Sequence, residues 1–388
     1  MPDAKRKLLF GTCLCVCLCV CLFTALSFAA HSPAQSKSVR HTQAAGALFP
    51  VSQGGKWGFI DREGRAVIAP RFESAAGFSE GLARVTLEGE PAFVNAAGEV
   101  VLKPRFDSAG DFSEGLAYVE TGWRTNPHIG VTTEMGRWGY VDKTGRLVVP
   151  LKFTRADPFS EGLAAVQLGK YFGERSGFVD HAGRIVFEFP FDASWGFHEG
   201  FALVRAKAGT FFLDREGKKL ATPEIDDYEA RSFSEGLAAV EIKGKWGYID
   251  RTGRVIVGPR FDDAGDFYDG LAAVKLPVDE SRYVTCPLSE PGDTSTSTKL
   301  YGYIDKTGRL VIAPQFEYAG PFSEGLANVS NCSKHVFIDK TGATILRVPF
   351  DDASPFHGGL ASVFLNNIAG ARTGYIDKTG RVVWEPTR

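Results

Sequence analysis

The chain has 388 residues, 44% of them hydrophobic and 23% charged, a balance typical of a globular protein with a buried core. Its formal charge of −2, with acidic and basic residues interleaved, argues against the basic face that nucleic-acid-binding proteins usually carry. The 44 glycines and 30 phenylalanines, with short apolar runs between them, indicate strands and turns.

The N-terminus has the features of a secretory signal. Residues 5–7 (Lys-Arg-Lys) precede an apolar run over residues 8–26, and small residues follow it. This order predicts a cleaved signal peptide over residues 1–30. The alternative is an uncleaved anchor, since a run of roughly 19 apolar residues is just long enough to span a bilayer. In both cases we expect an extracytoplasmic protein, periplasmic or secreted, that contacts a membrane only through a retained leader.

After a small, polar stretch at residues 31–45, which predicts a flexible linker, one cassette fills residues 46–388. "KWGFIDREGR" at 56–65 recurs as "RWGYVDKTGR" at 137–146 and "KWGYIDRTGR" at 245–254. Each copy holds three short apolar–polar runs bounded by Gly, Pro and Asp, which predicts a three-stranded meander. A partial N-terminal strand at 46–51 and a half unit at 372–388 flank complete units near 56–88, 91–120, 137–168, 176–206, 209–242, 244–276, 299–330 and 335–365.

The turn between the first two strands of each unit has a clear sequence signature. Asp61 is followed three residues later by Gly64. An Asp side chain at this position accepts a hydrogen bond from the backbone two residues on, and Gly supplies the positive φ that closes the hairpin. The same pair recurs as Asp142 and Gly145, Asp250 and Gly253, and Asp305 and Gly308.

A single unit cannot bury its apolar face, whereas stacked neighbours can. The sequence therefore predicts an all-β tandem array of about nine units held by apolar interfaces between successive units. The divided ninth unit fits an open β-spiral or solenoid, and it also fits a propeller-like ring in which the two ends of the array meet. Because a standard propeller blade has four strands and this unit has three, we favour the spiral.

The recurring "K-W-G-[FY]-I-D-x-x-G" followed by "F-x-E-G-L-A-x-V" resembles the WG (KWG) repeat family of bacteria. The resemblance covers about residues 46–388, although only Trp57, Trp138 and Trp246 keep the tryptophan. It implies a repeat architecture and often export, and it implies no particular activity.

The sequence offers little support for catalysis. It has no phosphate-binding loop and no Ser-His-Asp set, and we expect no enzyme activity, cofactor or metal. Rows of carboxylates recur with the repeat, at the turn Asp and at the Glu of "FSEG"; we expect each Asp to bind its own turn and each Glu to be solvated. His198 and His357 replace the Ser of "FSEG", either as drift within the repeat or as a local functional departure.

Two insertions, at about 121–136 and 277–298, interrupt the regular spacing. Insertions in repeat proteins often lie on one binding face, and Trp, Arg and Tyr are favoured interface anchors. The candidate partner-binding residues are therefore Trp123, Arg124, His128, Arg282 and Tyr283.

Five of the seven cysteines lie in the leader, which leaves Cys286 and Cys332. They fall in the same connection of neighbouring units, and an oxidising compartment permits a disulfide between them.

Together these features favour a non-catalytic, exported repeat scaffold that mediates protein–protein interaction at the cell envelope. The alternative is a module that binds an envelope glycan or cell-wall polymer through its aromatic side chains.

Overall fold

The computed structural model describes residues 47–387, except 123, 127–130, 135, 170–174, 227–228, 288–293, 333 and 368–369. The expected signal peptide at 1–30 and linker at 31–45 lie outside the described residues. Within those ranges there is no α-helix, and hence none that could span a bilayer; the sole helical turn is the 3-10 helix η1 (Glu280–Arg282).

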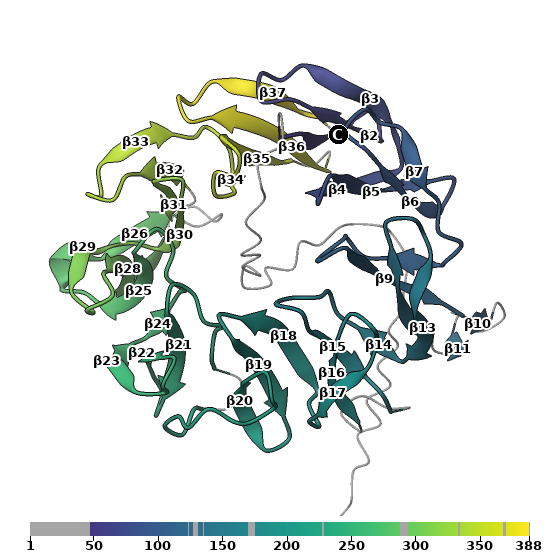
Figure 1. The fold of residues 1–388 in the computed structure, drawn as a ribbon. Coiled ribbons are helices and arrows are strands. Elements are labelled where there is room, and N and C mark those ends of the chain that lie inside the picture. The colour runs from purple at the N-terminus through teal and green to yellow at the C-terminus, as the bar shows by residue number, and fades with distance from the viewer. Residues whose placement is uncertain are drawn as a thin grey trace, which may run out of the picture. The chain divides into compact units, whose positions relative to one another are not determined.

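Small antiparallel sheets follow one another as nine blades around a ring, and the first and last blades are neighbours where the ring closes, with β1 against β36 (Figure 1). In blades 1 to 5 the strands are β1 (Phe49–Gln53), β2 (Lys56–Ile60), β3 (Ala66–Phe72); β4 (Ser74–Ser79), β5 (Leu82–Leu87), β6 (Glu90–Val94), β7 (Val100–Leu102); β8 (Ser108–Ala109), β9 (Leu116–Thr121), β12 (Arg137–Asp142), β13 (Leu147–Phe153); β14 (Arg155–Ala156), β15 (Ala164–Gln167), β16 (Ser176–Val179), β17 (Ile185–Glu188); and β18 (Ala193–His198), β19 (Phe201–Ala206), β20 (Gly209–Leu213).

Blades 6 to 9 continue the same order. Their strands are β21 (Leu237–Ile242), β22 (Lys245–Asp250), β23 (Val255–Phe261); β24 (Asp263–Ala264), β25 (Ala272–Pro277), β28 (Lys299–Ile304), β29 (Leu310–Phe316); β30 (Tyr318–Ser323), β31 (Leu326–Asn331), β32 (Lys334–Ile338), β33 (Thr344–Arg347); and β34 (Asp352–Ala353), β35 (Leu360–Asn367), β36 (Gly370–Asp377), β37 (Val382–Thr387). Two separate hairpins, β10 (Arg124–Asn126) with β11 (Val131–Glu134) and β26 (Val284–Pro287) with β27 (Thr294–Ser297), belong to the insertions.

The all-β repeat array is confirmed, but the structure has the propeller-like ring, so the open spiral that the strand count favoured is wrong. Six of the described sheets have four strands, because a short inner strand such as β24 precedes the three that the sequence predicts. The sequence cassette is also offset from the blade. Residues 56–88 supply β2 and β3 to blade 1 and β4 and β5 to blade 2, so the chain passes from one blade to the next inside each cassette.

The glycine of the "WG" pair is explained by the path of the outer strand. In blade 1 the pairing of β2 with β3 shifts register between Trp57 and Phe59, as at a β-bulge. A Cβ on the intervening Gly58 would lie 2.3 Å from the carbonyl oxygen of Ile68. The outer strand therefore crosses β2 too closely for any side chain at this position.

The hydrophobic core lies between the blades. Nine clusters of buried side chains occur in the described residues, and each draws on two neighbouring blades. At the centre of each cluster an aromatic ring from the first strand of the sequence cassette packs against a phenylalanine of the next blade, with ring centroids 4.7–5.6 Å apart. The pairs are Phe59–Phe78, Phe93–Phe112, Tyr140–Phe159, Phe178–Phe197, Phe212–Phe233, Tyr248–Phe267, Tyr303–Phe322, Phe337–Phe356 and Tyr375–Phe49.

Candidate functional site

The row of turn aspartates is occupied by the turns themselves. In the first turn, Asp61 Oδ1 accepts hydrogen bonds from the backbone N–H of Glu63 at 3.0 Å and of Arg65 at 2.9 Å. Its Oδ2 pairs with the Arg65 guanidinium at 2.7 Å, and Gly64 has a φ of 84°. In two later turns the hydroxyl of the following Thr and the guanidinium of the Arg lower the aspartate pKa to about 2, at Asp142 and Asp305. These carboxylates are thus committed to holding the hairpins.

The glutamates of "FSEG" are not simply solvated, because they join neighbouring blades. Glu235, in the turn immediately before β21 of blade 6, accepts a hydrogen bond from Gly270 N–H of blade 7 at 3.1 Å. Its carboxylate also lies 3.1 Å from Lys306 Nζ of blade 7. The same bond from carboxylate to glycine N–H occurs at Glu80–Gly115, Glu114–Gly162, Glu161–Gly200, Glu199–Gly236, Asp269–Gly325 and Glu324–Gly359.

The serine of "FSEG" adds a second bond to the next blade. Ser234 Oγ donates to the carbonyl of Phe267 at 2.7 Å. We call the contact between two neighbouring blades a joint. Four other joints have the same bond: Ser79–Phe112, Ser113–Phe159, Ser160–Phe197 and Ser323–Phe356. We call these serine and carboxylate bonds the turn belt. Each carboxylate residue has a left-handed backbone, such as φ 53° at Glu235, where glycine or asparagine is usual in a two-residue hairpin. That unusual position is the one sequence signal that could have revealed the belt.

The two histidines that replace this serine lie four blades apart. His198 Nε2 is 3.0 Å from the carbonyl oxygen of Trp195 in blade 5, and His357 N–H donates to Leu360 O in blade 9. The structure therefore does not bring them together. Throughout the described ranges, no group of three or more His, Cys, Asp or Glu side chains could hold a metal ion.

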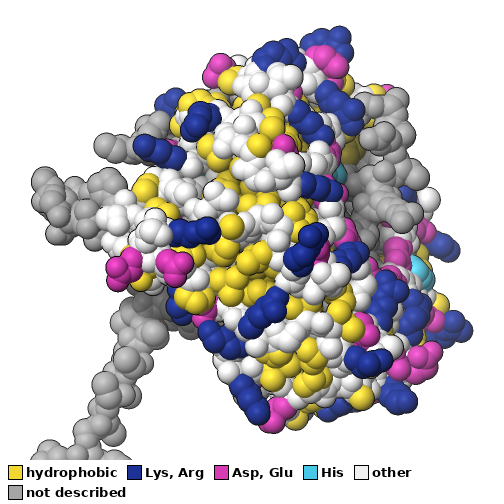
Figure 2. Space-filling view, turned by 90° about the vertical axis from the view of Figure 1, so that its left-hand side faces the viewer, with side chains coloured by type: hydrophobic (Ala, Val, Ile, Leu, Met, Phe, Trp, Pro, Cys, Tyr) yellow, Lys and Arg dark blue, Asp and Glu magenta, His cyan; other side chains and the backbone are white. Residues whose placement is uncertain are grey.

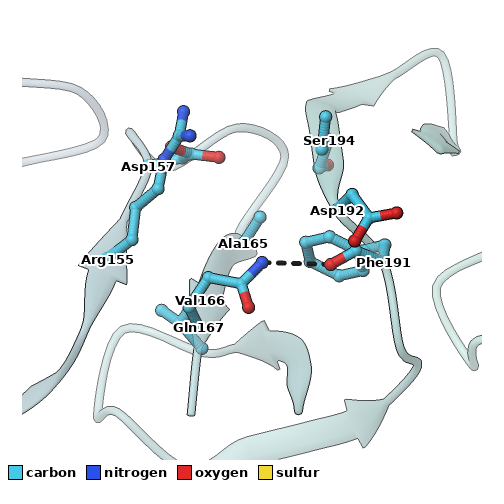
Figure 3. Close-up of a pocket in the computed structure, with 9 residues that line it drawn as sticks. Arg155, Asp157, Ala165, Val166, Gln167, Phe191, Asp192 and Ser194 are labelled. Atoms are coloured by element: carbon cyan, nitrogen blue, oxygen red, sulfur yellow. Dashed lines mark hydrogen bonds and ion pairs between the residues drawn. The ribbon is translucent and has the colours of Figure 1, made fainter. Parts of the chain in front are cut away.

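A small hollow lies between blades 4 and 5 (Figure 3). Gln167 in its wall donates from Nε2 to the carbonyl of Phe191 at 3.1 Å. Burial raises the pKa of the nearby Asp157 carboxyl, although the charge of Arg155 opposes the shift. The space is about 10 Å³, which is room for roughly one water molecule. A substrate could not be accommodated there.

Both insertions join the second strand of a blade to the third, so their loops leave the same edge of the ring. They belong to blade 3 and blade 7, however, and the hairpins β10–β11 and β26–β27 lie on opposite sides of the ring (Figure 1). The predicted residues therefore do not form one site. Trp123 and His128 lie outside the described residues, and Arg124 is described only by its backbone in β10.

On blade 7 the start of the insertion forms an open hollow against the outer strand β29. Leu276, Pro277 and Val278 from β25 and the chain after it face Leu310 and Pro314 of β29, with Asp279 and Arg282 at the rim, around a space of about 250 Å³. Leu310 is 44% exposed, and Tyr283, next to Arg282, is 38% exposed. Figure 2 looks onto the side of the ring that carries β29 and shows apolar side chains running between Lys and Arg.

The insertion is held against blade 8. Ser297 Oγ donates to Glu317 Oε1 at 2.6 Å, and Glu317 Oε2 accepts the backbone N–H of Cys332 at 2.7 Å. Cys332 is disulfide-bonded, and its Sγ is 3.8 Å from the carbonyl oxygen of Thr285. The side chain of Cys286 lies outside the described residues, so the predicted Cys286–Cys332 pair stays a prediction.

Comparison with solved structures supports the fold alone. The crystal structure of the eukaryotic initiation factor shares 12% identity with this chain, with a TM-score of 0.60, and the alignment covers 89% of this chain and 96% of that one. The tricorn protease shares 15% identity over 87% of this chain and 44% of its own, with a TM-score of 0.27. Hsv2 of Kluyveromyces lactis shares 9% over 56% and 70%, with a TM-score of 0.33. The last two scores are too low to support an argument.

No curated protein sequence matches the chain. The profile of the WG containing repeat does match it, in eight segments that together span most of the array: 57–90, 92–122, 138–172, 177–208, 211–246, 246–276, 301–331 and 337–367. Each segment covers the last two strands of one blade and the start of the next, as the offset between cassette and blade requires. The chain therefore belongs to the WG-repeat family.

Proposed function

We propose that this protein is a non-catalytic scaffold that binds a partner protein through the blade-7 hollow. The hollow is the observation that supports this: its walls are aliphatic, it is open, and charged Asp279 and Arg282 stand at its rim. An apolar centre with a polar rim is the usual anatomy of a protein–protein interface. The leader over residues 1–30 supports a location at the cell envelope.

The chemistry of the described residues favours binding over catalysis. The carboxylates of both repeated rows are engaged in turns and in the turn belt, and the inter-blade hollow in Figure 3 admits about one water molecule. The blade-7 hollow, at about 250 Å³, is smaller than the roughly 300–1,000 Å³ typical of small-molecule sites. It has room for one large apolar side chain of a partner, and Arg282 can pair with an acidic neighbour of that side chain.

The test compares two leucines at the same position of two outer strands. Leu310 lines the hollow and is 44% exposed, whereas Leu147 begins β13 of blade 3 and is 40% exposed. The wild type, Leu310→Asp and Leu147→Asp are used to capture proteins from an envelope extract. Each captured protein is identified by mass spectrometry, purified and titrated by calorimetry. We expect Leu310→Asp to weaken binding by at least about tenfold, as for an interface hot spot, and Leu147→Asp to leave it unchanged.

Equal affinities for the two variants would contradict the proposal. The glycan alternative is tested in parallel with the same three proteins and insoluble cell wall. Retention on cell wall with no protein captured would favour that alternative. Exposed Tyr283 would then be the side chain to replace, since an aromatic ring is a natural platform for a sugar.

A further inference from the structure

Eight joints of the ring have a feature that the ninth lacks: the chain itself crosses them. At the joint between blades 6 and 7, for example, only Asp262 separates the end of β23 from the start of β24. The joint between blades 9 and 1 is bridged by no such connection. Blade 9 is built from β34–β37 and blade 1 from β1–β3, and no strand is shared between their sheets.

In the residues that the structure describes, the turn belt is also missing at this joint. Gly358 stands where the other turns carry a belt carboxylate, and a Cβ there would lie 3.3 Å from Phe49 Cζ. Blade 1, as described, has neither an inner strand nor the inner turn that would receive the belt bonds. Blades 2 to 9 are therefore connected by the belt, and blade 1 is outside it.

In blade 1 the edge of β1, beside which no inner strand is described, is satisfied in another way. In other blades the carbonyl at the position of Pro50 accepts a bond from the inner strand, as Ala273 O does from Gly265 N–H. Here Tyr375 Oη of blade 9 donates to Pro50 O at 3.0 Å. Proline has no N–H, so this edge of β1 presents no unpaired donor at that position. The joint is completed by the Phe49–Tyr375 ring contact, with centroids 5.6 Å apart, and by a small cluster with Val51, Ile60 and Leu360.

We propose that the ring opens and recloses at the joint between blades 9 and 1, which acts as a built-in gate. Opening there breaks no backbone connection and no belt bond, whereas opening at any other joint requires unfolding of a crossing segment. The open form exposes the apolar faces of β1 and β36, including Phe49 and Tyr375. This inference is independent of the blade-7 hollow.

Hydrogen exchange of the full wild-type chain, followed by mass spectrometry, tests the gate without any substitution. Opening leaves blades 1 and 9 with one neighbour each, so their own sheets unfold locally more often and their amides exchange faster, while blades held on both sides exchange only on wider unfolding. Peptides from β1, β2 and β36 should exchange at least about tenfold faster than peptides from β22, β23 and β25, the strands of the 6–7 joint. Equal or slower exchange at blades 1 and 9 would overturn the proposal.

A second test compares hydrogen exchange in two matched variants. Tyr375 and Tyr248 each donate one hydroxyl bond to the neighbouring blade, Tyr248 to Gly265 O at 2.9 Å. Tyr375→Phe should raise exchange in β1 and β36 by a further factor of about three or more, since one lost bond of this kind is a large share of what holds the gate. Tyr248→Phe should change exchange at its own joint by less, because the belt and the crossing chain remain. An equal or larger effect of Tyr248→Phe would overturn the proposal.

Discussion

The joint between blades 6 and 7 and the joint between blades 9 and 1 are built around the same aromatic contact. Tyr248 packs on Phe267 and Tyr375 packs on Phe49, and each tyrosine hydroxyl donates to a carbonyl of the neighbouring blade. The first joint adds two belt bonds and a crossing chain; the second has the smallest of the nine clusters. The aromatic pair therefore defines where blades meet, and the belt and the backbone determine how firmly.

Removing the ring at each joint should give the largest effect. Tyr248 is fully buried, so Tyr248→Ala should lower the free energy of unfolding by about 3–5 kcal/mol, as for other buried aromatic truncations. Tyr375 is 8% exposed in a smaller cluster, and Tyr375→Ala should lower it by less. Urea unfolding followed by fluorescence measures both. If the two values were the same, the joints would not differ as described.

Replacing the glycine beneath an outer strand by alanine should give the next largest loss of stability. In blade 6, a Cβ on Gly247 would lie 2.6 Å from Val257 O, whereas a Cβ on Gly258 would have nothing within 4 Å. We expect Gly247→Ala to destabilise by about 1–3 kcal/mol, the usual range for overpacking, and Gly258→Ala to have little effect. Thermal unfolding of the pair checks this. A neutral Gly247→Ala would show that the outer strand can move away.

An aspartate precedes the phenylalanine of the inter-blade ring pair in blades 7 and 3, and its hydrogen bonding differs between the two. Asp266 is buried, which raises its pKa to about 6, and within the described residues its Oδ1 has no hydrogen-bond partner. Asp111, at the same position in blade 3, is half-buried and pairs with Arg84 at 3.0 Å. Because the folded form of Asp266 holds its proton more tightly than the unfolded form, the stability that it contributes is lost as pH rises from about 4 to 6.

Asp266→Asn should therefore stabilise the protein at pH 7 by about 3 kcal/mol, since the pKa is raised from 3.8 to about 6 and each pKa unit corresponds to about 1.4 kcal/mol, and should have little effect at pH 4. Asp111→Asn should instead destabilise slightly, by less than about 1 kcal/mol, through loss of a surface ion pair. Denaturant unfolding at the two pH values measures both variants. Destabilisation by Asp266→Asn at pH 7 would mean that the buried carboxylate has a partner in solution.

The smallest effect is expected at an exposed turn. The Thr307 hydroxyl and the Arg309 guanidinium lower the pKa of Asp305 to about 2, so its contribution to stability is present above about pH 4 and is lost as pH falls toward 2. Asp305→Asn should keep the turn, as Asn95 does in blade 2 with the same two backbone bonds. The melting temperatures of wild type and variant should differ at pH 6 and converge by pH 2. A constant difference would rule out this titration as its cause.

The repeat cassette, the apolar interfaces and the two possible forms of the array, spiral or ring, could be predicted from the sequence, because all three follow from a repeated pattern. It did not predict the inner strand, which in several blades has only two residues, such as Asp263 and Ala264, too few to show alternation. The roles of Glu235 and Gly58 were missed because their contacts come from a neighbouring blade and from an overlying strand, which no local pattern reports. Arg282 and Tyr283 were found as an insertion, but the hollow beside them depends on β29, which follows later in the chain.

The central claim is that nine blades close into one ring through side-chain packing between the first and last. The most direct test is a pulsed electron-resonance distance between spin labels, attached through unnatural amino acids at Glu63 and Thr379, equivalent turn positions of blades 1 and 9. A closed ring predicts one short main distance, matching that between Thr307 and Thr341 on the adjacent blades 7 and 8. A long or broad distribution for the first pair, with a short one for the second, would contradict the closed ring.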